Sequence, residues 1–201
     1  QRCCADMPMA AEKRNYRVLV AGGDKVYDYI CENLPRGSYD PILRASDAGE
    51  VRRMMLDTPA DIVIINTPLS DEFGTELALD LSDGIVGILL LVKGEIYDQV
   101  CDKVEDSGVL TLGKPVSRQG FYSAVKLLTA MTARLGKLDK ENHTLQEKMA
   151  DIRVVNRAKW LLIERHHMKE QDAHYFIEKQ AMDMRLSRRQ VAENIIRSYD
   201  T

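Results

Sequence analysis

Apolar residues recur at three- and four-residue intervals between residues 121 and 166, and this spacing predicts one long helix. With Phe121 at heptad position a, nine of the ten a and d positions down to Ile152 are apolar. A helix of about 45 residues spans about 70 Å, which is more than a small domain can bury. The exposed seam therefore predicts a coiled coil with a second helix. The seam positions are Phe121, Ala124, Leu128, Met131, Leu135, Leu138, Asn142, Leu145, Met149 and Ile152.

The polar exception in this seam is Asn142, at an a position. A lone Asn at a pairs with its symmetry mate in a parallel dimer and fixes register, at a cost in stability. We therefore predict a parallel homodimer. The alternative is that this helix packs only on its own domain. The residues expected at the dimer interface are Leu128, Met131, Leu135, Leu138, Asn142 and Leu145.

Between residues 16 and 117 the pattern changes to short apolar runs, at residues 16–21, 61–65, 86–92 and 109–112. Residues 41–44 could add one more short strand. Runs of this length suit strands that are buried on both faces of a parallel sheet. The segments between them carry helical spacing, so we predict a doubly wound, flavodoxin-like α/β domain.

This α/β region resembles the receiver domain of bacterial response regulators, through residues 61–66 (DIVIIN), Pro68, Asp71, Gly74 and the Lys114-Pro115 pair. A receiver carries an acidic pair after strand one, a phosphorylated Asp after strand three, a Ser or Thr after strand four and a Lys after strand five. The corresponding positions here are Gly22 and Gly23, Asn66, about Leu91, and Lys114.

Only the lysine of that receiver set is present in this chain. Phosphoryl transfer needs carboxylates to hold Mg²⁺, and Gly22 and Gly23 offer no side-chain oxygen. The amide of Asn66 is not a useful nucleophile. We therefore predict a pseudo-receiver with a degenerate phosphoacceptor site that cannot be phosphorylated.

Residues 151–201 predict three helices. The long helix continues to about Arg165, a second helix follows at residues 170–185, and a third begins at Ser187. Ser187 and Gln190 have the spacing of a capping box. About 50 residues in three short helices make a small bundle with a modest core.

This C-terminal segment resembles the ANTAR domain of transcription antiterminators, and a receiver, a coiled coil and this bundle are also the layout of that family. The resemblance is carried by residues 156–159 (NRAK), 161–162 (LL), 164–166 (ERH), Ala173, 181–183 (AMD), 191–192 (VA) and 195–196 (II). It implies a dimer that binds paired hairpins in nascent transcripts and prevents terminator formation. Some family members are held inactive by a ligand-sensing partner protein, and such a regulatory partner is a candidate here.

Charge changes sign along the chain. Residues 1–117 carry 12 Lys and Arg against 20 Asp and Glu, whereas residues 118–150 carry 6 against 3 and residues 151–201 carry 10 against 8. A polyanion is therefore expected to bind late in the chain. Trp160 and Tyr175 are candidate base-stacking residues, and the alternative for Trp160 is a core or interface position. The residues expected to bind RNA are Arg157, Lys159, Arg185, Arg188 and Arg189.

We accordingly divide the chain into a disordered lead (1–15), a pseudo-receiver (16–117), a coiled-coil dimerisation helix (118–150) and an RNA-binding bundle (151–201). The N-terminus has no apolar run of signal-peptide length and no stretch approaches the length of a membrane span, so a cytoplasmic protein without membrane contact is expected. No cofactor, metal or enzymatic activity is expected, since catalytic spacings are missing. The competing interpretations are a DNA-binding response regulator and a protein-interaction adaptor.

Overall fold

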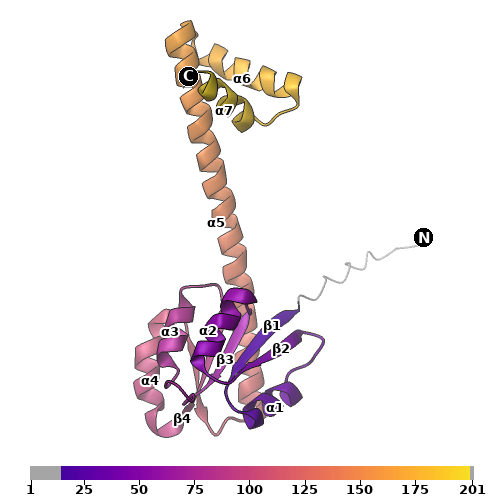
Figure 1. The fold of residues 1–201 in the computed structure, drawn as a ribbon, viewed down its shortest axis with the longest axis vertical. Coiled ribbons are helices and arrows are strands. Elements are labelled where there is room, and N and C mark those ends of the chain that lie inside the picture. The colour runs from indigo at the N-terminus through magenta and orange to yellow at the C-terminus, as the bar shows by residue number, and fades with distance from the viewer. Residues whose placement is uncertain (1–14, 200–201) are drawn as a thin grey trace, which may run out of the picture. The chain divides into compact units, whose positions relative to one another are not determined.

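The computed structural model describes residues 15–199, which fall into two compact units (Figure 1). The first, here called the receiver-like unit, ends at Gly136, and the second, the C-terminal unit, begins at Lys137. The helix α5 (Arg118–His166) runs through both. Residues 1–14 of the expected disordered lead lie outside the described residues.

The receiver-like unit is built on a parallel sheet of five strands in the order β2-β1-β3-β4-β5. This is the predicted doubly wound α/β fold. Its strands are β1 Tyr16–Ala21, β2 Tyr39–Ala45, β3 Ile62–Asn66, β4 Gly87–Lys93 and β5 Leu110–Lys114. Its helices, besides the start of α5, are α1 Asp24–Asn33, α2 Ala48–Asp57, α3 Thr75–Ser82 and α4 Tyr97–Val104, with short 3-10 turns at Gly94–Ile96 and Glu105–Ser107.

Helices cover both faces of this sheet (Figure 1). On one face α1 and α5 pack on the strands, and on the other face α2, α3 and α4 do so. The central strands β3 and β4 are apolar and buried up to their last residues, Asn66 and Lys93, because both faces of these strands are covered. The predicted strand at residues 41–44 is confirmed as part of β2, at the sheet edge, where Pro41 can lack its ladder hydrogen bond.

The first turns of α5 belong to the core of the receiver-like unit. Phe121, Ala124 and Leu128 are buried in the cluster that α1 and the sheet form. The approach is close, since a Cβ atom on Gly87 would lie 2.8 Å from the Oγ1 atom of Thr132. The expectation that Leu128 lies at a dimer interface is therefore wrong, because its side chain is buried in the core of the receiver-like unit.

The C-terminal unit consists of the second part of α5, α6 (Glu170–Met184) and α7 (Arg188–Tyr199). The predicted capping box is confirmed: the Ser187 amide donates to the Gln190 side chain at 2.9 Å, and the Gln190 amide donates to the Ser187 hydroxyl at 3.2 Å. The core of the unit is small, as expected for this length. Its buried residues are Ala158, Leu162, Ala173, Ile177, Ala181, Val191 and Ala192.

Candidate functional site

The carboxyl edge of the parallel sheet is the first candidate site, because ligands of open α/β sheets bind there. Asn66 ends β3 and Lys114 ends β5, and the Lys114 ammonium donates to the Asn66 Oδ1 atom at 3.1 Å and to the Thr67 carbonyl at 2.6 Å. Gly22 lies against Asn66, since a Cβ atom on this glycine would sit 3.1 Å from the Asn66 Cβ atom. Four of the five predicted positions, Gly22, Gly23, Asn66 and Lys114, thus lie at this edge.

The position predicted for the Ser or Thr was wrong by two residues. Strand β4 continues past Leu91 to Lys93, and Lys93 pairs in register with Lys114. Leu91 is aliphatic and buried inside the strand. The residue that ends β4 at this edge is Lys93, a second lysine beside Lys114. Burial lowers the pKa of the Lys114 ammonium, and the positive charge of Lys93 lowers it further by a smaller amount.

This edge does not fit a magnesium ion. The carboxylate of Asp24 pairs with Arg44 on β2, and that of Asp71 accepts the amides of Ala48 and Gly49 at the start of α2. The hydrogen bond from the Ala48 amide has the largest effect and, together with that from Gly49, lowers the pKa of the Asp71 carboxyl group. Within residues 15–199 no group of three or more His, Cys, Asp or Glu side chains could hold a metal ion. The edge instead presents two lysines and an amide.

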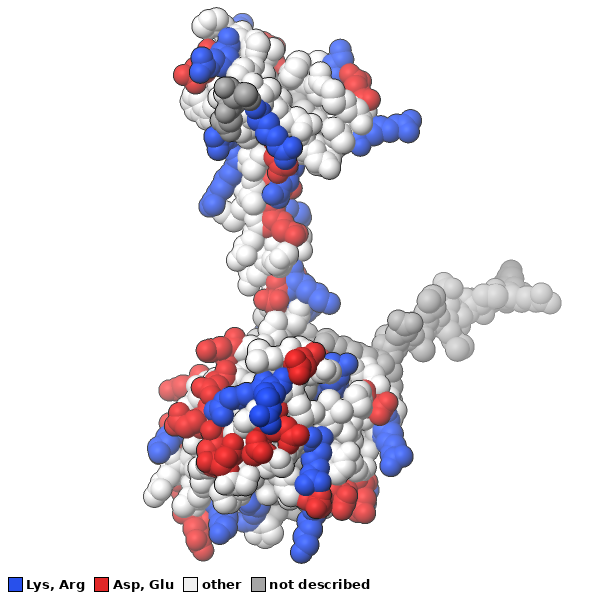
Figure 2. Space-filling view, viewed as in Figure 1, with Lys and Arg blue, Asp and Glu red and all other residues white. Residues whose placement is uncertain are grey.

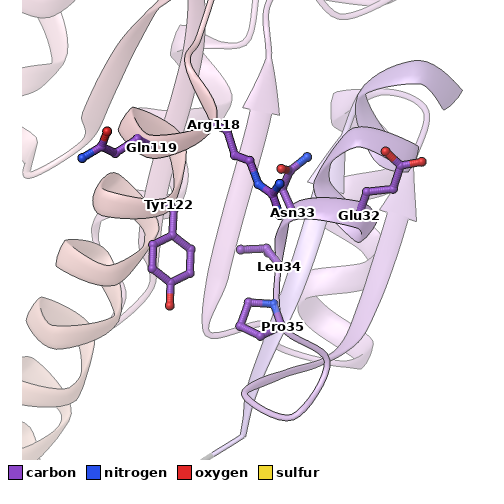
Figure 3. A pocket seen from close by; sticks show the side chains of 7 residues that line it. All are labelled: Glu32, Asn33, Leu34, Pro35, Arg118, Gln119 and Tyr122. Carbon is purple, nitrogen blue, oxygen red and sulfur yellow. The ribbon is translucent and has the colours of Figure 1, made fainter.

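A further hollow of about 580 Å³ lies on the same unit between the end of α1 and the start of α5 (Figure 3). Arg118 and Tyr122 from α5 face Leu34 and Pro35 across it, and Glu32 stands at its border (Figure 3). It holds one acidic and one basic side chain and no arrangement for chemistry.

Beyond the receiver-like unit's core, the heptad seam of α5 is exposed. At its apolar positions from Met131 to Ile152 the residues are between 43% and 59% exposed. Asn142 is exposed in the same row. These apolar residues are Met131, Leu135, Leu138, Leu145, Met149 and Ile152.

Basic side chains gather around a hollow of about 550 Å³ in the C-terminal unit. Of the five residues expected to bind RNA, Lys159, Arg188 and Arg189 line it, whereas Arg157 and Arg185 are exposed outside its lining. The complete lining comprises Lys148, Asp151, Ile152, Val155, Asn156, Lys159, His174, Ser187, Arg188 and Arg189. The sequence interpretation did not single out Lys148, although it lies on the same helix face as Ile152 and Lys159.

Carboxylates hold all three of the predicted residues that line this hollow. Lys159 pairs with Glu170 at 3.2 Å and Arg188 with Glu178 at 3.0 Å. Arg189 donates to Asp151 and to Glu193, both at 2.9 Å. Basic and acidic side chains consequently lie close together on this unit, whereas acidic ones gather over α2 and α3 of the receiver-like unit (Figure 2).

The two aromatic candidates for base stacking are exposed. Trp160 exposes 70% of its surface and Tyr175 exposes 63%. A core role for Trp160 within this unit is therefore wrong. Arg185 has a different local role: it adopts the left-handed conformation, with φ 55°, that ends α6.

Comparisons with known proteins agree with this architecture. Residues 143–196 match the family model of the ANTAR domain, which begins within α5 and takes in α6 and most of α7. The signal receiver domain of an HD domain-containing protein from Pseudomonas fluorescens Pf-5 superposes with a TM-score of 0.57 at 17% identity, covering 65% of this chain and 98% of that one. At this identity the likeness concerns the fold alone.

The receiver-like fold followed by a match to the ANTAR domain thus resembles the layout of response regulators that carry an ANTAR domain. Two curated relatives are regulators by name. The transcriptional regulatory protein PdtaR of Mycobacterium tuberculosis is 26% identical over 187 residues, covering 92% of this chain and 91% of the relative. The aliphatic amidase regulator of Pseudomonas aeruginosa is 24% identical over 145 residues, covering 70% and 72%. The chain resembles the ANTAR-domain response regulators along both of its units.

Among the described helices, none combines the length and apolar character needed to cross a membrane.

Proposed function

We propose that this protein is an RNA-binding transcription antiterminator that acts as a homodimer on hairpins of nascent transcripts. The observation that carries the proposal is the hollow rimmed by Lys148, Lys159, Arg188 and Arg189 within the part that matches the ANTAR domain. Four cations around one concave surface suit a phosphate backbone that changes direction, as it does in a hairpin loop.

The lining favours RNA with unpaired bases. Ile152 and Val155 give the hollow an apolar wall, and Asn156 adds an amide that can pair with a base edge. Trp160 and Tyr175 offer exposed rings to stack against splayed bases. Sequence-specific RNA recognition uses these elements on single-stranded loops.

The ion pairs around this hollow need not prevent RNA binding. Lys159 and Arg188 each exchange one exposed carboxylate for a phosphate, and exposed pairs are worth only about 0–1 kcal/mol. The counterions released from RNA favour this exchange at low salt.

The exposed seam of α5 supports the dimer. Apolar side chains at a 3.5-residue repeat from Met131 to Leu145 remain partnerless within residues 15–199, and a second copy of the same helix would bury them. Asn142 in this row favours two parallel strands.

Signal input in this proposal does not use phosphorylation. Asn66 lacks a carboxylate, and Gly22 and Gly23 carry no side-chain oxygen that could hold a metal ion. A partner protein that senses a ligand, as in some ANTAR regulators, would then control activity.

The test is a salt titration of binding to a tandem-hairpin RNA and to duplex DNA of matched length. We expect tighter binding to the RNA and an affinity that falls with salt, by a slope of about 0.7–0.9 per phosphate contact. Arg188→Ala with Arg189→Ala should weaken binding and flatten the slope by up to about two units. Arg36→Ala with Arg53→Ala is the matched control, because both arginines are exposed on the receiver-like unit.

A charge-preserving pair, Arg188→Lys with Arg189→Lys, separates loss of contacts from loss of folding, which circular dichroism monitors. Trp160→Ala should weaken RNA binding at an unchanged melting temperature if the ring stacks on a base. Equal affinity for RNA and DNA would favour a DNA-binding regulator. Absence of binding to either at low salt would favour an adaptor.

A further inference from the structure

A hollow of about 340 Å³ lies beside the degenerate phosphoacceptor position, between α1, the carboxyl edge of the sheet and the start of α5. Its size falls within the range of small-molecule sites. It is lined by Lys25, Val26, Tyr29, Asn66, Leu91, Lys114, Pro115, Val116 and Phe121.

The polar end of this hollow has unbalanced positive charge. The Lys114 ammonium is partly buried, and both of its hydrogen-bond acceptors, the Asn66 amide oxygen and the Thr67 carbonyl, are neutral. No carboxylate lines the hollow, and Lys25 adds a second cation. A partly buried cation without a counter-ion is costly, so an anion would be stabilised here.

The remaining wall is apolar. Leu91 and Phe121 are buried, and Val26 and Val116 are partly so. Tyr29 also lines the hollow, and its buried hydroxyl has no hydrogen-bond partner within the described residues. Inorganic phosphate would leave these walls unfilled, whereas an organic anion could cover them and offer Tyr29 an acceptor.

We propose that this hollow binds a small organic anion, a carboxylate on an aromatic or branched apolar body, between Lys114 and the apolar wall of α1 and α5. The loss of the receiver acids inverts the charge of the site, so it takes an anion in place of a cation. Because Val116 and Phe121 flank the start of α5, the ligand would contact the helix that continues into the ANTAR domain.

The experiment is isothermal titration of the full chain with benzoate as the probe, beside benzyl alcohol and inorganic phosphate. We expect saturable binding of benzoate, at least about tenfold weaker binding of benzyl alcohol because it lacks the charge, and weaker binding of phosphate because it lacks the apolar body. Lys114→Met should lower the benzoate affinity by about tenfold or more, and Lys103→Met, at an exposed lysine of α4, should leave it unchanged.

If the Lys114→Met protein does not fold, a benzoate titration of the unaltered protein, followed by NMR, still tests the proposal. Benzoate should shift the side-chain amide signals of Asn66 and the backbone signals of residues 114–116. No saturable benzoate binding, equal affinity in a folded Lys114→Met protein, or shifts confined to other regions would overturn the proposal. Phosphate binding as tightly as benzoate would overturn the assignment of an organic ligand.

Discussion

Arg188 illustrates how strongly single residues of the proposed RNA interface depend on their acidic neighbours. It lies ten positions after Glu178 in the chain, and the turn between α6 and α7 brings the two side chains to 3.0 Å. Each such pair subtracts from the positive charge that RNA would meet. We therefore expect the carboxylates around the hollow to lower the affinity for RNA modestly.

Glu178→Gln should raise the affinity for hairpin RNA by up to about fivefold, since an exposed ion pair is worth roughly 0.2–1 kcal/mol and Arg188 would no longer need to exchange it. Fluorescence anisotropy at low salt measures this. Glu164→Gln is the matched control, because Glu164 is exposed on α5, makes no ion pair within residues 15–199 and changes the net charge equally. An equal gain in both variants would show that overall charge, not this pair, is responsible.

The degenerate phosphoacceptor site gives a second prediction at this scale. Acetyl phosphate with Mg²⁺ should leave the mass of the protein unchanged, because Asn66 is not a nucleophile and the metal carboxylates are missing. Asn66→Asp alone should also remain unmodified. Intact-mass spectrometry, with a phosphorylatable receiver as positive control, decides the matter. A gain of one phosphoryl group on the unaltered chain would refute a phosphorylation-independent receiver.

Residue positions were predictable from sequence where they depend on nearby neighbours. The capping box of Ser187 and Gln190 is local, and the sequence spacing is sufficient to find it. Lys93 directly follows the apolar run that ends at Val92, so the sequence could have located it, but the Ser or Thr position was assigned at about Leu91, within the run. The partner of Arg188 could not be found this way, since it depends on how two helices pack.

At the scale of elements, α5 has two surfaces that one sequence pattern cannot distinguish. Phe121, Ala124 and Leu128 satisfy the heptad repeat and equally satisfy packing on the sheet, where the structure places them. From Met131 onward the same repeat faces solvent. Hydrophobic spacing predicts that a helix face is buried, but it does not say against what. The seam available to a second copy is therefore shorter than the pattern suggests.

Asn142→Ile should raise the thermal stability of the dimer and relax its selectivity toward trimers or mixed registers, because a buried Asn pair trades stability for two-stranded register. Multi-angle light scattering and thermal melts of both proteins measure the two effects. Leu138→Asn is a useful contrast, since it adds a polar residue to the seam at a d position and should weaken the dimer. A monomeric unaltered protein, or antiparallel pairing by crosslinking, would remove the role assigned to Asn142.

At the scale of the whole molecule, the order of parts followed from the sequence because each part has its own period. Continuous apolar runs gave the parallel sheet, and helical spacing gave α5 and the two helices after it. The charge change along the chain pointed to the C-terminal unit as the polyanion-binding part. Which cations lie together could not be predicted, since Arg157 and Lys159 are two positions apart on one helix and face different ways, with only Lys159 at the hollow.

The most direct test of the central claim is recovery and sequencing of RNA crosslinked to this protein in cells. We expect enrichment of paired hairpins that overlap terminators in nascent transcripts, and loss of that enrichment in the Arg188→Ala, Arg189→Ala protein but not in the Arg36→Ala, Arg53→Ala protein. Crosslinked RNA that is absent, or that is spread evenly over transcripts in all three proteins, would contradict it.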